Sequence, residues 1–74
     1  DWFSFFLEEC CDVGEDYTAK SGEVYNEYRA FCMQKGEFAR STAEFYSVLT
    51  QEGFKRKKTS KGSMINGFKL KSEL

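Results

Sequence analysis

Apolar residues near the start of the chain recur three or four positions apart, which is the spacing of one helix face. Asp1 can cap such a helix or occupy its first turn. We therefore predict a leading helix over residues 1–11. Phe5 widens the apolar face, so we expect part of it to contact another domain of a longer parent protein. The stripe itself consists of Trp2, Phe3, Phe6, Leu7 and Cys10.

A second apolar stripe predicts a helix over residues 21–35, after an acidic loop over residues 12–20. Ser21 is the expected N-cap, and Gly36 is the expected C′ residue because glycine tolerates a left-handed backbone. Acidic residues in the first half of this helix and Lys35 in its last turn suit the helix dipole. The stripe is formed by Val24, Tyr25, Tyr28, Phe31 and Cys32.

A third helix is predicted over residues 41–52, and we expect it to be a recognition helix. Ser41 and Glu44 have the spacing of a capping box, and Gly53 ends the pattern. Two helices joined by a short connector match a helix-turn-helix pair, although the connector alone does not distinguish it from any αα-hairpin. The apolar stripe of this helix contains Phe45, Val48 and Leu49.

Residues 54–71, FKRKKTSKGSMINGFKLK, predict a β-hairpin rather than a disordered basic tail. Gly62 lies in a polar turn, and the return segment alternates so that one face carries Met64, Asn66, Phe68 and Leu70. A disordered tail has no need of apolar residues at these places. The expected fold class is mainly α with a small β-hairpin: a winged helix-turn-helix in which three helices precede a basic wing. We expect one domain over residues 1–74, excised from a larger protein because the chain lacks an initial Met.

The net charge of −1 hides a division between the two halves of the chain. Residues 1–37 carry three basic and nine acidic side chains, whereas residues 38–74 carry eight basic and three acidic ones. Such a division suggests that a polyanion binds one side of the domain.

The composition disfavours several classes of function. The chain has no His and no Cys-x-x-Cys, so we expect no metal and no cofactor. No nucleophile is convincingly accompanied by a base, so we predict that the domain is not an enzyme. Three cysteines, two of them adjacent, form a poor disulfide framework and favour a reducing, cytoplasmic location; Cys10 and Cys32 are expected to be buried. No apolar run approaches the roughly 20 residues of a membrane span.

The candidate nucleic-acid contacts lie in the last two predicted elements. Lysines often protect an exposed strand edge, which explains one or two of them, but contact with phosphates explains the whole run. Polar side chains of the 41–52 helix can touch phosphates or base edges, and the alternative is an exposed polar face. The predicted DNA-binding residues are Arg40, Ser41, Thr42, Ser47 and Gln51 with Lys55, Arg56, Lys57, Lys58 and Lys61. The aromatic residues of segment 2–6 are assigned to the core or to a domain interface, because no cation lies within that segment.

Three stretches carry a family resemblance. SGEVYNEYRAFC, through Tyr25, Tyr28 and Cys32, resembles the Leu-Tyr-x-x-Tyr-x-x-Trp-Cys signature of a C-terminal domain in phage- and plasmid-type primase–helicases, relatives of the poxvirus primase–helicase. AEFYSVLTQEGF is similar to the Phe-Gly-x-x-Leu-x-x-x-Gly-Phe stretch of that domain, and NGFKL is similar to its Gly-Ile-x-Leu ending. The chain departs from the pattern at Tyr46, where the family often has Gly, and at Ser47, where it often has a basic residue.

The resemblance implies a winged-helix domain that follows a superfamily-three AAA+ helicase and acts in replication of a phage, plasmid or prophage. The ATPase motifs are then expected upstream, since this chain has no Gly-x-x-x-x-Gly-Lys-Ser/Thr. The expected function is that of a DNA-binding accessory domain that holds duplex or forked DNA near the adjoining helicase. The alternative is a protein-interaction domain that docks on the helicase or on another replication protein through its acidic half or its Trp2–Phe6 face.

Overall fold

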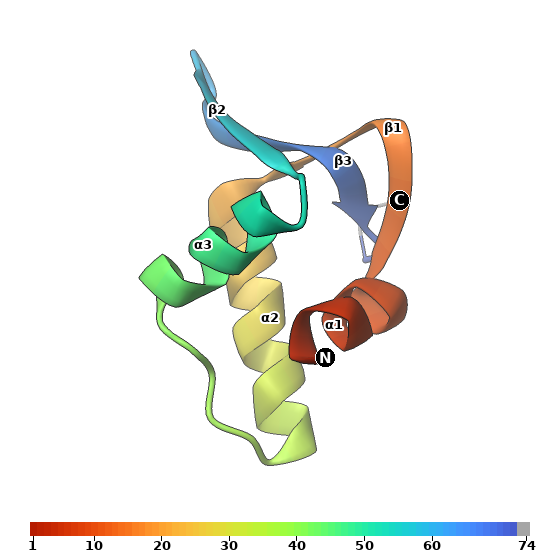
Figure 1. Cartoon of the computed structure of the whole chain (residues 1–74), viewed down its shortest axis with the longest axis vertical. Coiled ribbons are helices and arrows are strands. Elements are labelled where there is room, and N and C mark those ends of the chain that lie inside the picture. Colours follow the sequence, from red (N-terminus) through yellow and green to blue (C-terminus); the bar gives the residue numbers. More distant parts are fainter. Residues whose placement is uncertain (73–74) are drawn as a thin grey trace.

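Three helices pack against one face of a three-stranded antiparallel sheet in the computed structural model, which describes residues 1–72 (Figure 1). The strands lie in the order β1-β3-β2, so the last strand of the chain is the central one. In chain order the elements are α1 (Trp2–Cys10), β1 (Cys11–Lys20), α2 (Ser21–Lys35), α3 (Thr42–Gln51), β2 (Lys55–Thr59) and β3 (Gly62–Leu70).

The predicted fold class, a mainly α winged helix-turn-helix with only a hairpin of β-structure, was wrong. Helices account for 47% and strands for 33% of the described residues, which makes this a small α/β fold. The difference arises from residues 12–20, which were expected to form an acidic loop but belong to β1.

Strand β1 escaped prediction because it lies at the edge of the sheet and exposes most of its side chains. Cys11 and Ala19 are buried, whereas Val13 and Tyr17, at positions of the same parity, are exposed, so burial does not alternate along the strand. Its pairing with β3 is also interrupted by a bulge, because residues 14–17 lie between two paired stretches.

Strand β3 changes face at Gly67. Ile65 is buried on the helix side, but so are Phe68 and Leu70, which differ from it in parity. The expectation that Asn66 shares a face with Phe68 and Leu70 was therefore wrong, since Asn66 is exposed. Gly67 has φ 118°, a backbone conformation that side-chain-bearing residues rarely adopt, and this local conformation accompanies the switch.

The helix ends follow the sequence signals with one exception. Asp1 caps α1, because its Oδ1 accepts a hydrogen bond from the Phe3 N–H at 2.9 Å. Gly36 ends α2 with φ 70°, as the C′ prediction required. Ser21, the predicted cap, instead lies inside α2, and its Oγ is hydrogen-bonded to Ser63 Oγ of β3 at 2.8 Å.

Half of the predicted capping box forms at α3. Ser41 Oγ accepts a hydrogen bond from the Glu44 N–H at 3.2 Å, so Ser41 is the N-cap. The Glu44 carboxylate does not reach back to the cap; its Oε2 lies 2.6 Å from Nη1 of Arg40, with which it forms an ion pair.

Aromatic residues dominate the core. Tyr28 of α2 stacks on Phe45 of α3 with 4.7 Å between the ring centroids, and Phe3 and Phe6 of α1 pack around Phe45. This cluster fastens the three helices together and covers the apolar face of the sheet, which consists of Cys11, Ala19, Ile65, Phe68 and Leu70.

The cysteines are free thiols, and burial differs from the expectation at one of them. Cys32 is buried as predicted, but Cys10 is only half-buried and its neighbour Cys11 is the buried one. Burial raises the pKa of the Cys11 thiol from its ordinary value of 9.0 to about 12. Among residues 1–72, no helix combines the length and the apolar character that a membrane-spanning segment needs.

Candidate nucleic-acid interface

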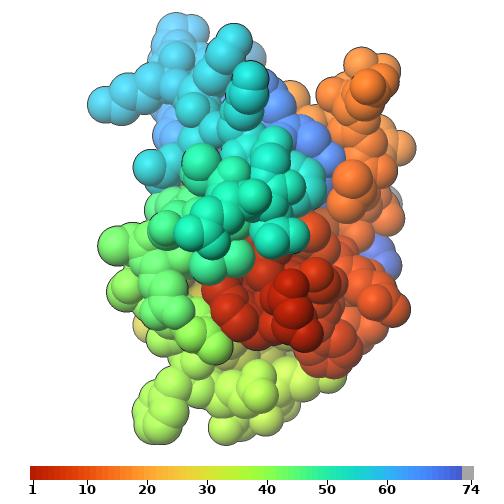
Figure 2. Space-filling model, viewed as in Figure 1, coloured from red at the N-terminus to blue at the C-terminus, as the bar shows by residue number. Residues whose placement is uncertain are grey.

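Five predicted site residues lie on one projecting hairpin, which consists of β2, the turn at residues 60–61 and β3 and is called the basic hairpin below. Lys55, Arg56, Lys57 and Lys58 are all exposed on β2, an edge strand, and Lys61 is exposed in the turn. The turn is fixed by Thr59, whose Oγ1 donates to the Gly62 carbonyl at 2.9 Å and accepts from the Lys61 N–H at 3.2 Å. In Figure 2 the residues of the hairpin project from the top of the molecule next to those of α3.

The register of β2 against β3 divides the basic residues between the two faces of the sheet. Arg56 is paired with Ile65, which is buried under the helices, and Lys58 is paired with Ser63, whose hydroxyl contacts α2. Cross-strand partners lie on the same face of a sheet, so these two cations are on the helix side.

The other two cations of β2 lie on the opposite face. Lys55 is paired with Asn66, which is exposed, and Lys57 is paired with Met64. Neighbouring residues of a strand point to opposite faces, which agrees with this assignment. The run of four basic residues is therefore two pairs of side chains that point in opposite directions.

Arg56 is held against α3 by an aromatic ring. Its Cζ lies 4.0 Å from the centroid of the Tyr46 ring, a cation–π contact. Tyr46 is itself fixed, because its hydroxyl donates a hydrogen bond to the Ser21 carbonyl at 2.8 Å. Burial raises the pKa of the Tyr46 hydroxyl, and the positive charge of Arg56 opposes that rise. In the sequence, Tyr46 stands out as a departure from a family pattern, and nothing there marks it as a partner of the hairpin.

The predicted residues of α3 have mixed roles. Thr42, Ser47 and Gln51 are exposed on the helix and available for contact. Ser41 uses its hydroxyl as the helix cap. Arg40 precedes α3 and is engaged elsewhere: it forms the ion pair with Glu44, and its Cζ lies 4.8 Å from the Trp2 ring centroid of α1. The structure thus brings together the hairpin and the outer side of α3, but it places Arg40 on the aromatic face of α1.

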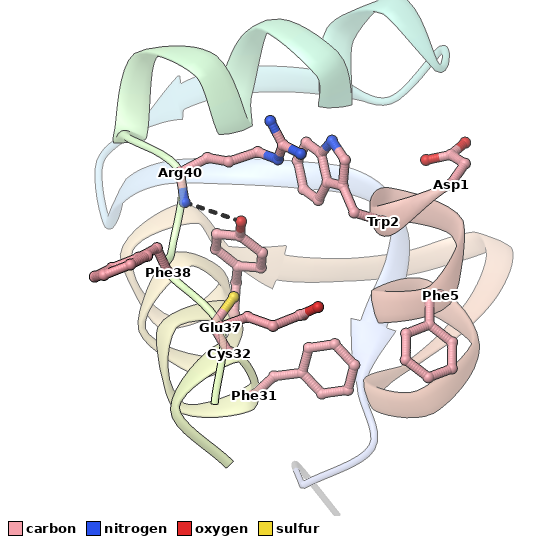
Figure 3. A pocket seen from close by; sticks show the side chains of 9 residues that line it. Asp1, Trp2, Phe5, Phe31, Cys32, Glu37, Phe38 and Arg40 are labelled. Atoms are coloured by element: carbon pink, nitrogen blue, oxygen red, sulfur yellow. Dashed lines mark hydrogen bonds between the residues drawn. The ribbon is translucent and has the colours of Figure 1, made fainter. Parts of the chain in front are cut away.

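A pocket of about 430 Å³ lies between the start of α1, the end of α2 and the connector before α3 (Figure 3). Phe38 of the connector borders this pocket and is fully exposed. The pocket was not predicted from the sequence, because the start of α1 is distant in the chain from the other two segments. The lining side chains include Asp1, Trp2, Phe5, Phe31, Glu37 and Arg40.

The charge near the aromatic rings of segment 2–6 also differs from what the sequence of this segment suggests. No cation lies within that segment, but folding brings two of them to its aromatic rings. Arg40 lies over Trp2, and Lys35 Nζ is 5.0 Å from the centroid of Phe5. Trp2 is half-buried, and only Phe5 of this segment's aromatic residues is exposed. The segment is therefore mainly a core element, with one exposed ring at the edge of the pocket.

Within residues 1–72, no group of three or more Cys, Asp and Glu side chains is arranged to hold a metal ion. Comparisons with protein-family models, with curated proteins and with solved structures find no match to this chain. The resemblance to the primase–helicase domain therefore rests on the sequence motifs alone.

Proposed function

We propose that this domain binds DNA, mainly through phosphate contacts of the basic hairpin, with α3 alongside. One observation carries the proposal. The five cations of β2 and the turn are exposed, and none of them forms an ion pair within residues 1–72, where the ion pair that does form joins Arg40 to Glu44. Adjacent uncompensated charges repel one another, and a polyanion relieves that repulsion.

Protection of the sheet edge is the simpler explanation of the same residues. A few lysines are enough to discourage pairing of an exposed edge with another chain. The other edge strand, β1, is protected differently, by a bulge and by acidic residues. Edge protection therefore accounts for charge on β2 but not for its consistent sign and density, which favours a specific partner of negative charge.

The biological setting that we propose follows from the sequence motifs. The domain is an accessory part of a primase–helicase from a phage, plasmid or integrated element, with no catalytic role or cofactor of its own, and it acts in the cytoplasm. Tethering a weak DNA-binding domain to a motor raises the effective concentration of DNA at that motor, so high affinity is unnecessary.

The test is a fluorescence-anisotropy titration of a labelled duplex at about 50 and 200 mM salt, the range over which phosphate contacts lose affinity steeply. One variant changes Arg56, Lys57 and Lys58 to Ser. The control variant changes Arg29, Lys35 and Lys71 to Ser, which also removes one arginine and two lysines from exposed positions.

We expect the hairpin variant to bind far more weakly and the control to bind as the wild type does. The slope of log K against log salt should fall by about 0.9 for each phosphate that the variant no longer neutralises. Absence of binding by the wild type at low salt, or equal weakening in both variants, would contradict the proposal.

A second candidate function is protein docking, and the exposed Phe38 beside the pocket favours it. Exposed aromatic rings next to a hollow are common at protein interfaces. If docking on the adjoining helicase is the function, Phe38→Ser weakens assembly with a separately supplied helicase portion and leaves the DNA titration unchanged. The hairpin variant would show the reverse, so the two functions are distinguishable.

A further inference from the structure

The two faces of the basic hairpin differ in what surrounds them. On the helix side, Arg56 lies over Tyr46 of α3, and Lys58 points to the same face of the strand. On the other side, Lys55 and Lys57 extend from the sheet away from all three helices. We propose that only the helix side of the hairpin contacts DNA, and that Tyr46 is the positioning residue that holds Arg56 for this contact. The inference rests on the proposed function and specifies which surface performs it.

The contact between Arg56 and Tyr46 leaves the guanidinium able to bind a phosphate. An arginine that lies over an aromatic ring keeps its N–H groups at the edge of the guanidinium plane, where they can donate to phosphate oxygens. Within residues 1–72, Arg56 has no carboxylate partner that competes for these donors. Restricting the side chain in advance reduces the entropy lost when the phosphate binds.

Three contacts with the rest of the domain restrict the orientation of the Tyr46 ring. Its hydroxyl is bonded to the Ser21 carbonyl at 2.8 Å, and the ring packs against Phe45 and Tyr25 with centroid distances of 5.5 and 6.3 Å. Arg56 therefore rests on a surface that belongs to the core of the domain, whereas a lysine at the tip of a hairpin has no comparable support.

The helix side also continues onto α3. Thr50 lies one helical turn after Tyr46 and is exposed, and its Oγ1 donates to the Tyr46 carbonyl at 3.0 Å. Ser47 and Gln51 are exposed on the next row of the helix. A DNA backbone that contacts Arg56 and Lys58 thus meets neutral hydrogen-bonding side chains on the same surface. The carboxylate of Glu44, which precedes Ser47 on this row, is paired with Arg40.

The first test compares two matched double variants, Arg56→Ser with Lys58→Ser and Lys55→Ser with Lys57→Ser. Both remove two positive charges from the same strand, so they change the net charge and long-range attraction equally. We expect the first pair to weaken duplex binding roughly tenfold and to lower the log–log salt slope by about 1.8, because two phosphates are no longer neutralised. The second pair should stay within about twofold of the wild type with an unchanged slope.

Equal weakening by the two pairs would overturn the inference while leaving the proposed function intact. It would indicate a hairpin inserted into a groove with both faces against DNA, or attraction by net charge alone. Absence of salt-dependent binding in the wild type would overturn the proposed function, and this inference with it.

The second test is a double-mutant cycle on the positioning role of Tyr46. Tyr46→Leu should weaken binding less than Arg56→Ser does, because the charge of Arg56 remains, and it should cause no further weakening in the Arg56→Ser background. Tyr46→Phe keeps the ring and should bind about as well as the wild type. A purely structural role for Tyr46 predicts additive effects in the two backgrounds, and that result would refute positioning. Thermal melts of each variant verify that the domain is folded.

Discussion

The ring of Phe54 occupies the space that a side chain on Gly67 would fill: a Cβ at residue 67 would lie 2.6 Å from Cδ1 of Phe54. Phe54 in turn packs against Phe68 and Phe3, with centroid distances of 5.0 and 6.2 Å. The glycine therefore permits two things at once, the positive φ at which β3 changes face and the packing of Phe54 at the base of the basic hairpin.

Gly67→Ala should destabilise the domain. The substitution forces a side chain into a conformation that favours glycine and into contact with Phe54, for a combined cost of about 2–4 kcal/mol. Urea unfolding followed by circular dichroism measures the change. Gly22→Ala is the matched control, because it lies in α2 with nothing within 4 Å of an added Cβ. The control should stay within about 1 kcal/mol of the wild type, on the stabilising side, and equal behaviour of the two variants would contradict this account.

Two tyrosines fix the connector before α3 through hydrogen bonds to Arg40. Their hydroxyls should contribute unequally to the free energy of unfolding. Tyr28 Oη accepts from the Arg40 N–H at 3.0 Å, whereas Tyr25 Oη donates to the Arg40 carbonyl at 2.6 Å. Tyr28→Phe leaves a partly buried N–H without its partner and should cost about 1–3 kcal/mol, against about 0.5–1 kcal/mol for Tyr25→Phe, whose carbonyl partner is accessible to water. Chemical unfolding of the two variants decides the order, and a larger destabilisation by Tyr25→Phe would reverse the interpretation.

The cap of α3 makes a separate contribution to stability. Ser41→Ala removes the acceptor of the Glu44 N–H and should lower the free energy of unfolding by about 1 kcal/mol. Ser47→Ala, in the exposed interior of the same helix, should be neutral or slightly stabilising because alanine is the better helix former. If thermal unfolding shows no difference between these variants, the hydroxyl of Ser41 does not act as a cap.

Stability should decline at alkaline pH, in part because of Cys11. Its thiol has a pKa raised by burial from 9.0 to about 12, so the unfolded chain loses this proton at a lower pH than the folded one. The contribution is complete below the unfolded pKa and is lost as the pH rises toward the folded value, by at most about 1.4 kcal/mol per pH unit. Cys11→Ala should unfold more easily at neutral pH but show a shallower decline near pH 10. Urea unfolding at pH 7 and near pH 10 measures the loss of stability in each protein. An equal loss in Cys11→Ala and the wild type would exclude this thiol as a cause.

The helices were predictable because each buries a continuous stripe, and periodicity in the sequence reports that burial directly. Phe45 and Leu49 fix the buried side of α3 in this way, and Ser41 marks its beginning. Strand β1 was not predictable by the same means, since an edge strand with exposed Val13 and Tyr17 has a composition typical of a loop. Strand β3 was predicted as a strand, but Asn66 was wrongly assigned to the face that Phe68 and Leu70 occupy, because a local backbone change inverts parity without altering the pattern of residue types.

The candidate site was predictable in composition but not in geometry. The basic run from Lys55 to Lys58 is plain in the sequence, but its division between two faces depends on the register with β3. The contact between Arg56 and Tyr46 joins a strand to a helix, and the contact between Arg40 and Trp2 joins a connector to the first helix. Such pairs are fixed by the tertiary fold, and no local pattern encodes them.

The position of β3 at the centre of the sheet has a consequence for how the domain is made. The edge strands β1 and β2 do not pair with each other. Both pair with β3, which is the last of the three strands to be synthesised. During translation, β1 therefore waits without a partner until about residue 70 has left the ribosome, while the helices can already begin to associate. The three-stranded sheet can therefore form only after β3 has been synthesised, late in the production of this domain.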